Sequence, residues 1–314
     1  MQLFVYFIIF IIASQIVLEA ALSKVYAKKT DGNPNAIWVC LTITATFACA
    51  FFALTGIGSL TVDAPLIIYS IIYGTLIEIA YFINIFALKI SNITLVLIFS
   101  SVGSIVFPAI VGFSLGEEVA PAIIIGLILL LTATVIPCIS SEKSKTKIGF
   151  LSILVNLLNL IFQGFAASFS KFIAINPHIA ENTPSLFLLT NALMLIVSAT
   201  LLAFFACRMA KRRKKQAHSG DSSSEKAPYI PILKGYSVFL VVIILMMTLL
   251  SNTASYLEIF TLKYIGISAL SLVRSSLTLL LSYIPSIFFF KEKPTKKEIV
   301  STIICIAGLC VYFT

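Results

Sequence analysis

Long apolar runs separated by short polar segments are the dominant pattern along this chain. A bilayer core about 30 Å thick needs about 20 apolar residues in a helix, and the chain contains ten runs of that kind. The ten predicted spans are 3–23, 36–56, 65–88, 91–113, 119–139, 148–172, 185–206, 236–262, 266–290 and 297–313. The pattern therefore predicts an all-α integral membrane protein with ten transmembrane helices.

Composition supports the membrane assignment and excludes several classes of protein. Of the 314 residues, 59% are hydrophobic and 11% are charged, and the mean hydropathy is +1.06. A soluble domain cannot cover that much apolar surface, and disordered or disulfide-stapled chains have other compositions. None of the six cysteines forms a CxxC motif, and both histidines, His178 and His218, lie in predicted loops. We therefore expect no metal site, no cofactor and no enzymatic activity.

The net charge of +9 reflects the membrane topology of the chain rather than nucleic-acid binding. In the ten-span arrangement, 19 of the 22 Lys and Arg residues fall on one side, against Lys171 and Lys263 on the other, with Arg274 inside a span. The positive-inside rule makes the rich side cytoplasmic. We therefore expect the protein to lie in the cell (inner) membrane with both termini extracytoplasmic. The basic segment 207–235 is then a cytoplasmic linker.

The second half of the chain can be aligned with the first. Ser23-Lys24 falls on Ser170-Lys171, Ala87-Leu88-Lys89 on Thr261-Leu262-Lys263, and Gly116-Glu117-Glu118 on Lys291-Glu292-Lys293. Each repeat has five spans, and because five is odd, the second copy enters the membrane from the opposite side. The sequence thus predicts two inverted five-helix repeats, residues 1–140 and 141–314.

Each repeat also contains a run of small residues, a proline, aliphatic residues, an acidic turn and a last helix with glycine, at 100–134 and 275–313. With the five-plus-five arrangement, this pattern resembles the drug/metabolite transporter superfamily, and within it the proteins with two EamA domains. Lys291 departs from the pattern, because it stands where the family has Gly. The resemblance implies a transporter whose first, third, fourth, sixth, eighth and ninth spans surround a cavity.

Charged residues inside spans are the best candidates for function, because each costs about 3 kcal/mol on insertion scales. Glu78 lies near the centre of the third span, on one helical face with Gly74 and Ser70. Its carboxyl group either binds substrate or a proton, or is protonated and bonded to a neighbouring helix. Glu78 and Glu19 are therefore the candidates for proton coupling.

Arg274, in the ninth span, must find an anion or water because it does not lose its proton. Two roles stay open: an ion pair with Glu78 or Glu19, or recognition of an anionic group of the substrate. The remaining candidate substrate ligands lie on polar helix faces, at Asn159, Gln163, Asn252, Tyr256 and Ser275.

Pro108 and Pro285 occupy equivalent positions in the fourth and ninth spans. Each removes a helix hydrogen bond and can kink its span. The two prolines are candidate hinges, with a passive kink as the alternative.

Three acids in or near the spans, Glu19, Glu78 and Glu258, outnumber one base, Arg274. This balance favours a secondary transporter of a small polar, zwitterionic or cationic metabolite by alternating access, with the proton as candidate coupling ion. The alternatives are an exchanger of nucleotide sugars or other anionic solutes, and a membrane receptor or scaffold. The expected partners are a small solute, protons and the lipid bilayer, without nucleic acid, and the oligomeric state stays open.

Overall fold

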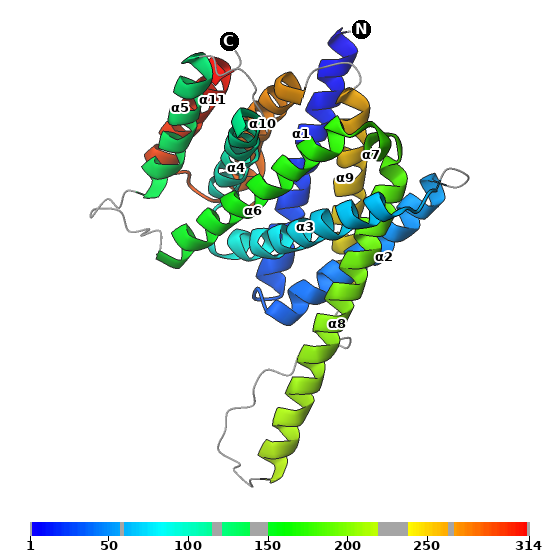
Figure 1. Ribbon diagram of the computed structural model, residues 1–314. Coiled ribbons are helices and arrows are strands. Elements are labelled where there is room, and N and C mark those ends of the chain that lie inside the picture. Colours follow the sequence, from blue (N-terminus) through cyan, green and yellow to red (C-terminus); the bar gives the residue numbers. More distant parts are fainter. Residues whose placement is uncertain are drawn as a thin grey trace.

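The computed structural model describes residues 2–56, 60–114, 121–138, 150–218, 238–262 and 267–312, and contains helices but no strand in these ranges (Figure 1). The helices are α1 (Gln2–Lys29), α2 (Pro34–Thr55), α3 (Ala64–Ile90), α4 (Ile93–Ser114), α5 (Pro121–Cys138), α6 (Phe150–Ile175), α7 (Pro177–Glu181), α8 (Thr183–His218), α9 (Val238–Leu262), α10 (Ile267–Ile284), the π-helix η1 (Pro285–Phe289) and α11 (Lys296–Tyr312).

Each predicted span overlaps a helix, the ninth span overlaps both α10 and η1, and α7 is an additional short helix. Among the described residues, α1, α2, α3, α4, α6, α8 and α9 are long and apolar enough to cross a membrane. The chain is thus an all-α protein of the multi-pass membrane type.

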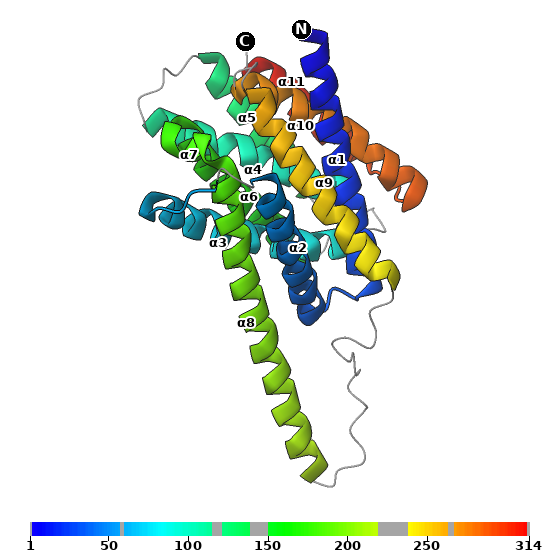
Figure 2. The same cartoon turned by 90° about the vertical axis from the view of Figure 1, so that its right-hand side faces the viewer.

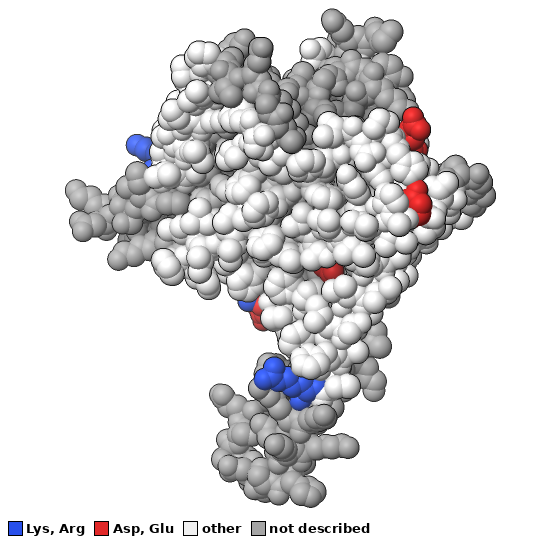
Figure 3. Space-filling model, in the orientation of Figure 1, with Lys and Arg blue, Asp and Glu red and all other residues white. Residues whose placement is uncertain are grey.

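Large apolar side chains cover the outside of the molecule. Phe4 is 60% exposed, Ile303 61% and Phe289 77%. On the face shown in Figure 3, the broad middle is almost entirely uncharged, and most of the coloured Lys, Arg, Asp and Glu atoms lie toward its edges. Lipid chains can solvate such a surface, whereas water cannot do so without a large free-energy cost.

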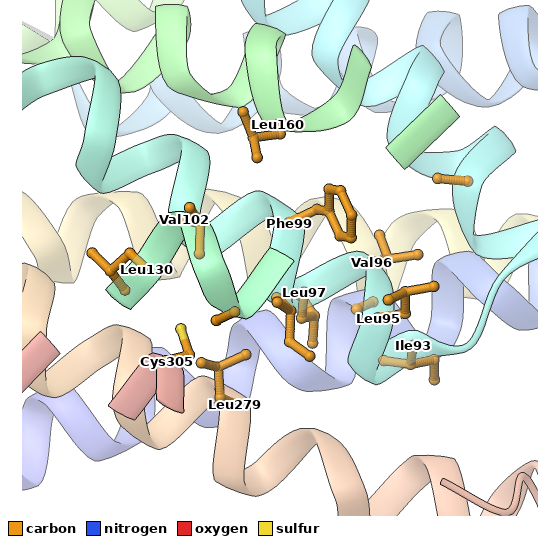
Figure 4. Close-up of a cluster of buried hydrophobic side chains, with 14 of the residues drawn as sticks. Ile93, Leu95, Val96, Leu97, Phe99, Val102, Leu130, Leu160, Leu279 and Cys305 are labelled. Atoms are coloured by element: carbon orange, nitrogen blue, oxygen red, sulfur yellow. The ribbon is translucent and has the colours of Figure 1, made fainter. Parts of the chain in front are cut away.

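Helix α4 forms the centre of the bundle. Fourteen of its 22 residues are buried, and its Leu97 and Val102 pack in one cluster with Leu279 of α10 and Cys305 of α11 (Figure 4). Gly103 lets α4 approach α6 closely, because a Cβ atom there would lie 2.1 Å from the carbonyl oxygen of Leu160. Only a residue without a side chain fits this contact.

The two halves of the chain are interleaved. Helix α1 packs mainly against α9 and α10, whereas α3 and α4 pack mainly against α6. Helix α2 packs against α8, and α5 lies beside α11 at one edge of the bundle in both views (Figures 1 and 2). Each of α1 to α5 therefore has its most extensive contact in the second half.

Two helices extend by six residues or more beyond the ends of their predicted spans. Helix α1 continues from residue 23 to Lys29, and α8 continues from residue 206 to His218. The first part of the predicted linker 207–235 is therefore helical, which agrees with the high helix propensity of its Lys, Arg, Ala and Gln residues; the part from residue 219 lies outside the described residues. With 36 residues, α8 is about 54 Å long, and it projects away from the bundle in both views (Figures 1 and 2).

The predicted ninth span is divided at Pro285. Helix α10 ends at Ile284, and η1 follows with a hydrogen bond from the Phe290 N–H to the Pro285 carbonyl (3.1 Å). Lys291 then adopts a φ of 53°. By contrast, Pro108 lies within the continuous helix α4. A π-turn and a left-handed residue thus follow the second proline.

We expect the substitution Lys291→Gly to stabilise the protein. A left-handed conformation costs a residue with a side chain about 1–2 kcal/mol, while glycine loses about 0.5–1 kcal/mol through chain entropy. The net gain should be about 0.5–1 kcal/mol, seen as a higher midpoint of thermal unfolding in detergent. Lys293→Gly, at an exposed neighbour without positive φ, is the control and should not stabilise; a lower midpoint for Lys291→Gly would contradict this explanation.

Candidate functional site

A cavity of about 580 Å³ lies inside the bundle. Its lining comes from α1, α3, α4, α6, α9 and α10, with Ala180 of α7 and the first turns of α8. The first six correspond to the first, third, fourth, sixth, eighth and ninth predicted spans. No lining residue in the described ranges belongs to α2, α5 or α11. Both halves of the chain therefore contribute to one internal site.

Four of the eight predicted ligands line this cavity, namely Glu19, Gln163, Arg274 and Ser275. They come from α1, α6 and α10 and are thus brought together from both halves. The candidate hinge Pro108 also lines the cavity, whereas Pro285 does not. Further polar lining residues, which the sequence did not single out as ligands, include Tyr73, Tyr81, Asn84, Ser104, Ser251 and Thr278.

The other four predicted ligands, Glu78, Asn159, Asn252 and Tyr256, lie outside the lining. Tyr256 is 53% exposed on the outer surface. The Asn252 amide donates a hydrogen bond to the Thr248 carbonyl of its own helix (2.7 Å). Glu78 and Asn159 are buried within the bundle.

Glu78 is on the face of α3 that contacts α8. On this face, a Cβ atom at Gly74 would lie 3.3 Å from the Thr190 carbonyl oxygen, and the Ser70 hydroxyl donates to the Leu186 carbonyl (3.2 Å). Glu78 is 4% exposed, and its Oε1 has no hydrogen-bond partner among the described residues. The carboxyl group thus sits in a helix interface rather than in the cavity.

Arg274 forms an ion pair with Glu258. The predicted ion pair of Arg274 with Glu78 or Glu19 is therefore wrong. Glu258 is near the end of α9 and Arg274 is in the second turn of α10, so the short connection between these helices brings the two residues to the same depth. Both line the cavity, and their charges cancel there.

The second acid of the cavity, Glu19, interacts with the hydroxyl groups of Tyr81 and Ser251, which also contact each other. Asn84 Oδ1 and Thr278 Oγ1 belong to lining residues and are buried without a hydrogen-bond partner in the described part of the chain. Buried polar atoms usually have a partner. These two atoms therefore suit hydrogen bonding to a polar solute.

Outside the membrane-spanning segments, Asp63 joins the start of α3 to α7. Its carboxylate accepts a hydrogen bond from the Leu66 backbone N–H (2.9 Å) and contacts the His178 ring. The bond from Leu66 and, after it, the one from His178 lower the pKa of Asp63. This contact ties α3 to α7, at the end of the bundle where Ala180 enters the cavity lining.

No protein-family model and no curated protein sequence matches this chain. A solved structure described as "Crystal structure of protein" is similar to it with a TM-score of 0.54 and 15% sequence identity, over 96% of this chain and 95% of that chain. At this identity the likeness shows a shared fold alone. Across the described ranges, no three His, Cys, Asp or Glu side chains lie close enough together to hold a metal ion.

A double-mutant cycle on Arg274 and Glu258 should reveal their coupling. Removing one partner leaves an uncompensated charge in the bundle, so Arg274→Gln and Glu258→Gln should each lower the stability. The double variant should lose less than the sum of the two single losses, with a coupling energy of about 1–3 kcal/mol. Unfolding of the four proteins in detergent measures this energy; additive losses would contradict a pair that acts as a unit.

Proposed function

We propose that this protein is a secondary transporter of a small polar, zwitterionic or cationic metabolite, of the drug/metabolite transporter type with two EamA-like repeats. The observation that carries the proposal is the internal cavity of about 580 Å³, lined by charged side chains from both halves of an apolar bundle. Its volume is in the usual range for small-molecule sites. Alternating access places the solute at such an interface between repeats.

The packing of the helices supports an inverted repeat of residues 1–140 and 141–314. If α1 to α5 correspond in order to α6, α8, α9, α10 and α11, the α1–α9 contact corresponds to α6–α3, and α1–α10 corresponds to α6–α4. The α2–α8 and α5–α11 contacts each join two helices that correspond to one another. An internal two-fold axis produces this exchange of partners. Ten membrane crossings and rocking of one repeat against the other follow from the same proposal.

The cavity charges favour a solute that is not multiply anionic. Arg274 is the single Lys or Arg among the lining residues in the described ranges, and Glu258 neutralises it. Glu19 adds a further carboxyl group. A nucleotide sugar carries two phosphate charges and would meet no unpaired cation among these lining residues. An anion exchanger is therefore less favoured than a transporter of zwitterionic or cationic metabolites.

The distribution of basic residues supports an orientation in the cell membrane. The ends of α1 and α3 and the segment after η1 meet at one end of the bundle, and they carry Lys28, Lys29, Lys89, Lys291 and Lys293. We infer that this basic end faces the cytoplasm. The termini are then extracytoplasmic.

Uptake by proteoliposomes tests the transport proposal. We expect the wild-type protein to move at least one class among amino acids, amines and neutral polar metabolites. Arg274→Gln should reduce the initial rate about tenfold, the effect of losing about 1.4 kcal/mol of binding free energy. Tyr256→Phe, on the outer surface, is the control and should keep the wild-type rate.

Two results would contradict the proposal. If the proteoliposomes take up no solute of any class, a receptor or scaffold is favoured. An unchanged rate for Arg274→Gln would exclude the cavity as the transport path.

Proton coupling makes a separate prediction. Glu19 lines the cavity, whereas Glu78 lies in the α3–α8 interface, so Glu19 is the better candidate to exchange a proton with the transport path. In Glu19→Gln, transport should lose its dependence on a pH gradient, while Glu78→Gln should keep it. Initial rates with and without an imposed pH gradient decide between the two acids, and a retained gradient dependence in Glu19→Gln would reject this role.

A further inference from the structure

Along α6, the lining of the cavity runs toward one end of the helix bundle only. Where α6 meets α7, its lining extends to Ile173, Ala180 and Thr183. Toward the basic end, the lining stops at Ser23 of α1, and its first residue on α6 is Gln163, although that helix begins at Phe150. The polar face of the first three turns of α6 is thus buried outside the cavity lining.

A buried ion pair lies directly beyond the closed end of the cavity. Lys24 follows the lining residue Ser23, is 2% exposed, and pairs with Glu292, which follows η1. The Lys24 ammonium group also donates a hydrogen bond to the Ser91 carbonyl oxygen (2.6 Å). The Glu292 carboxylate accepts a hydrogen bond from the Ser286 hydroxyl (2.9 Å).

This Lys24–Glu292 pair connects the two halves of the chain. Lys24 and Ser91 belong to the first half, at the end of α1 and in the α3–α4 turn, whereas Glu292 and Ser286 belong to the second. Two enclosed charges hold their position only while both partners stay together, because an unpaired buried charge is costly. Separation of the halves at this end therefore requires that the pair breaks and that both charges reach water.

A stripe of polar residues on α6 joins the pair to the cavity. The α6 stripe consists of Ser152, Asn156, Asn159 and Gln163, which share one helical face. The Ser152 hydroxyl and the Asn156 amide both contact the Ser91 hydroxyl, at 2.6 and 2.8 Å. At the other end of the stripe, Gln163 lines the cavity.

Asn159, in the middle of this stripe, is fully buried, and neither polar atom of its amide has a hydrogen-bond partner among the described residues. A buried amide without partners is costly. Such a group gains hydrogen bonds if water or a polar solute reaches it in a second conformation. The α6 stripe thus has the polarity of a permeation path, although it is closed in this structure.

We propose that the Lys24–Glu292 pair is a gate that closes the cavity toward the basic end, and that the α6 stripe is the path that opens when this pair breaks. This inference rests on the proposed alternating access and names the residues that control it. The conformation described here is then the one whose cavity extends toward α7. Breaking the pair favours the opposite conformation, in which the stripe is hydrated.

Thiol labelling tests the gate without a transported solute. The full chain, with its six native cysteines replaced, carries a single reporter, either Ser152→Cys on the stripe or Ser275→Cys in the cavity. Vesicles of both orientations are treated with a membrane-impermeant maleimide. In the Lys24→Met background, labelling of Ser152→Cys from the basic side should rise about tenfold, the effect of shifting the equilibrium by about 1.4 kcal/mol. Labelling of Ser275→Cys from the opposite side should fall.

Three further variants identify the cause of any change. Glu292→Gln removes the other charge and should act like Lys24→Met. Exchange of the charges, Lys24→Glu with Glu292→Lys, should bring both labelling rates back toward wild type. Lys28→Met removes a positive charge one turn further along α1 without removing a partner of Glu292, and it should leave both rates unchanged.

The outcomes separate a gate from a contact that only stabilises the fold. If the single variants raise the labelling of both reporters, the pair holds the fold together and the gate is refuted. Unchanged labelling of Ser152→Cys in Lys24→Met and Glu292→Gln also refutes it. Opposite changes at the two reporters without uptake of any solute would support the gate and reject the transport proposal. Uptake by the wild-type protein without opposite changes at the two reporters would support the transport proposal and refute the gate.

Discussion

Polar groups inside a bilayer must find their hydrogen-bond partners within the protein, because the hydrocarbon core offers none. This constraint explains the helical architecture and the orientation of its side chains. On the outer surface, the hydroxyls of Thr46, Thr75 and Thr132 donate to carbonyl oxygens one turn earlier in their own helices. The charged residues Glu19, Glu258 and Arg274 instead turn toward the shared interior. The outer surface is thus apolar, whereas these charged side chains gather at the cavity.

The buried polar groups of the bundle fall into two sets, those bonded to one another and those without partners among the described residues. Toward the basic end, polar groups bond to one another, as in the Lys24–Glu292 pair and in the contact of Asn156 with Ser91, and the bundle is closed there. In the cavity, Asn84 and Thr278 each have a buried oxygen atom without a hydrogen-bond partner among the described residues. Bonded groups hold helices together, whereas unbonded groups are available to a solute. Asn159 is buried near the bonded groups of α6, but its amide has no hydrogen-bond partner in the described part of the chain.

Interleaving of the halves makes the packing of each half depend on contacts with the other. Close helix approaches join different halves: Gly103 of α4 meets the backbone of α6, and Gly308 of α11 meets Leu129 and the backbone of α5. Close packing through small residues is typical of helix contacts in membranes, where dispersion replaces the hydrophobic effect. Neither half has its principal contacts within itself, so each half depends on the other for its packing.

Local features of this structure were predictable from the sequence. The long apolar helices follow from the lengths of the apolar runs, and the start of α11 follows from the capping box of Thr295 and Glu298, whose reciprocal hydrogen bonds are present. Polar spacing along single helices also identified Glu19, Gln163, Arg274 and Ser275, which line the cavity. Length, capping and spacing depend on neighbouring residues alone.

Only the tertiary structure determined which polar residues meet. Glu258 rather than Glu19 or Glu78 pairs with Arg274, and Lys24, whose charge the sequence explained as topology, pairs with a glutamate from the other half. Glu78 had the most favourable sequence position of the acids, yet it faces α8 and not the cavity. A helix can present either of two polar faces inward with the same sequence, and its rotation depends on the fit against all its neighbours at once. Local sequence does not contain that fit, because the neighbours come from distant parts of the chain.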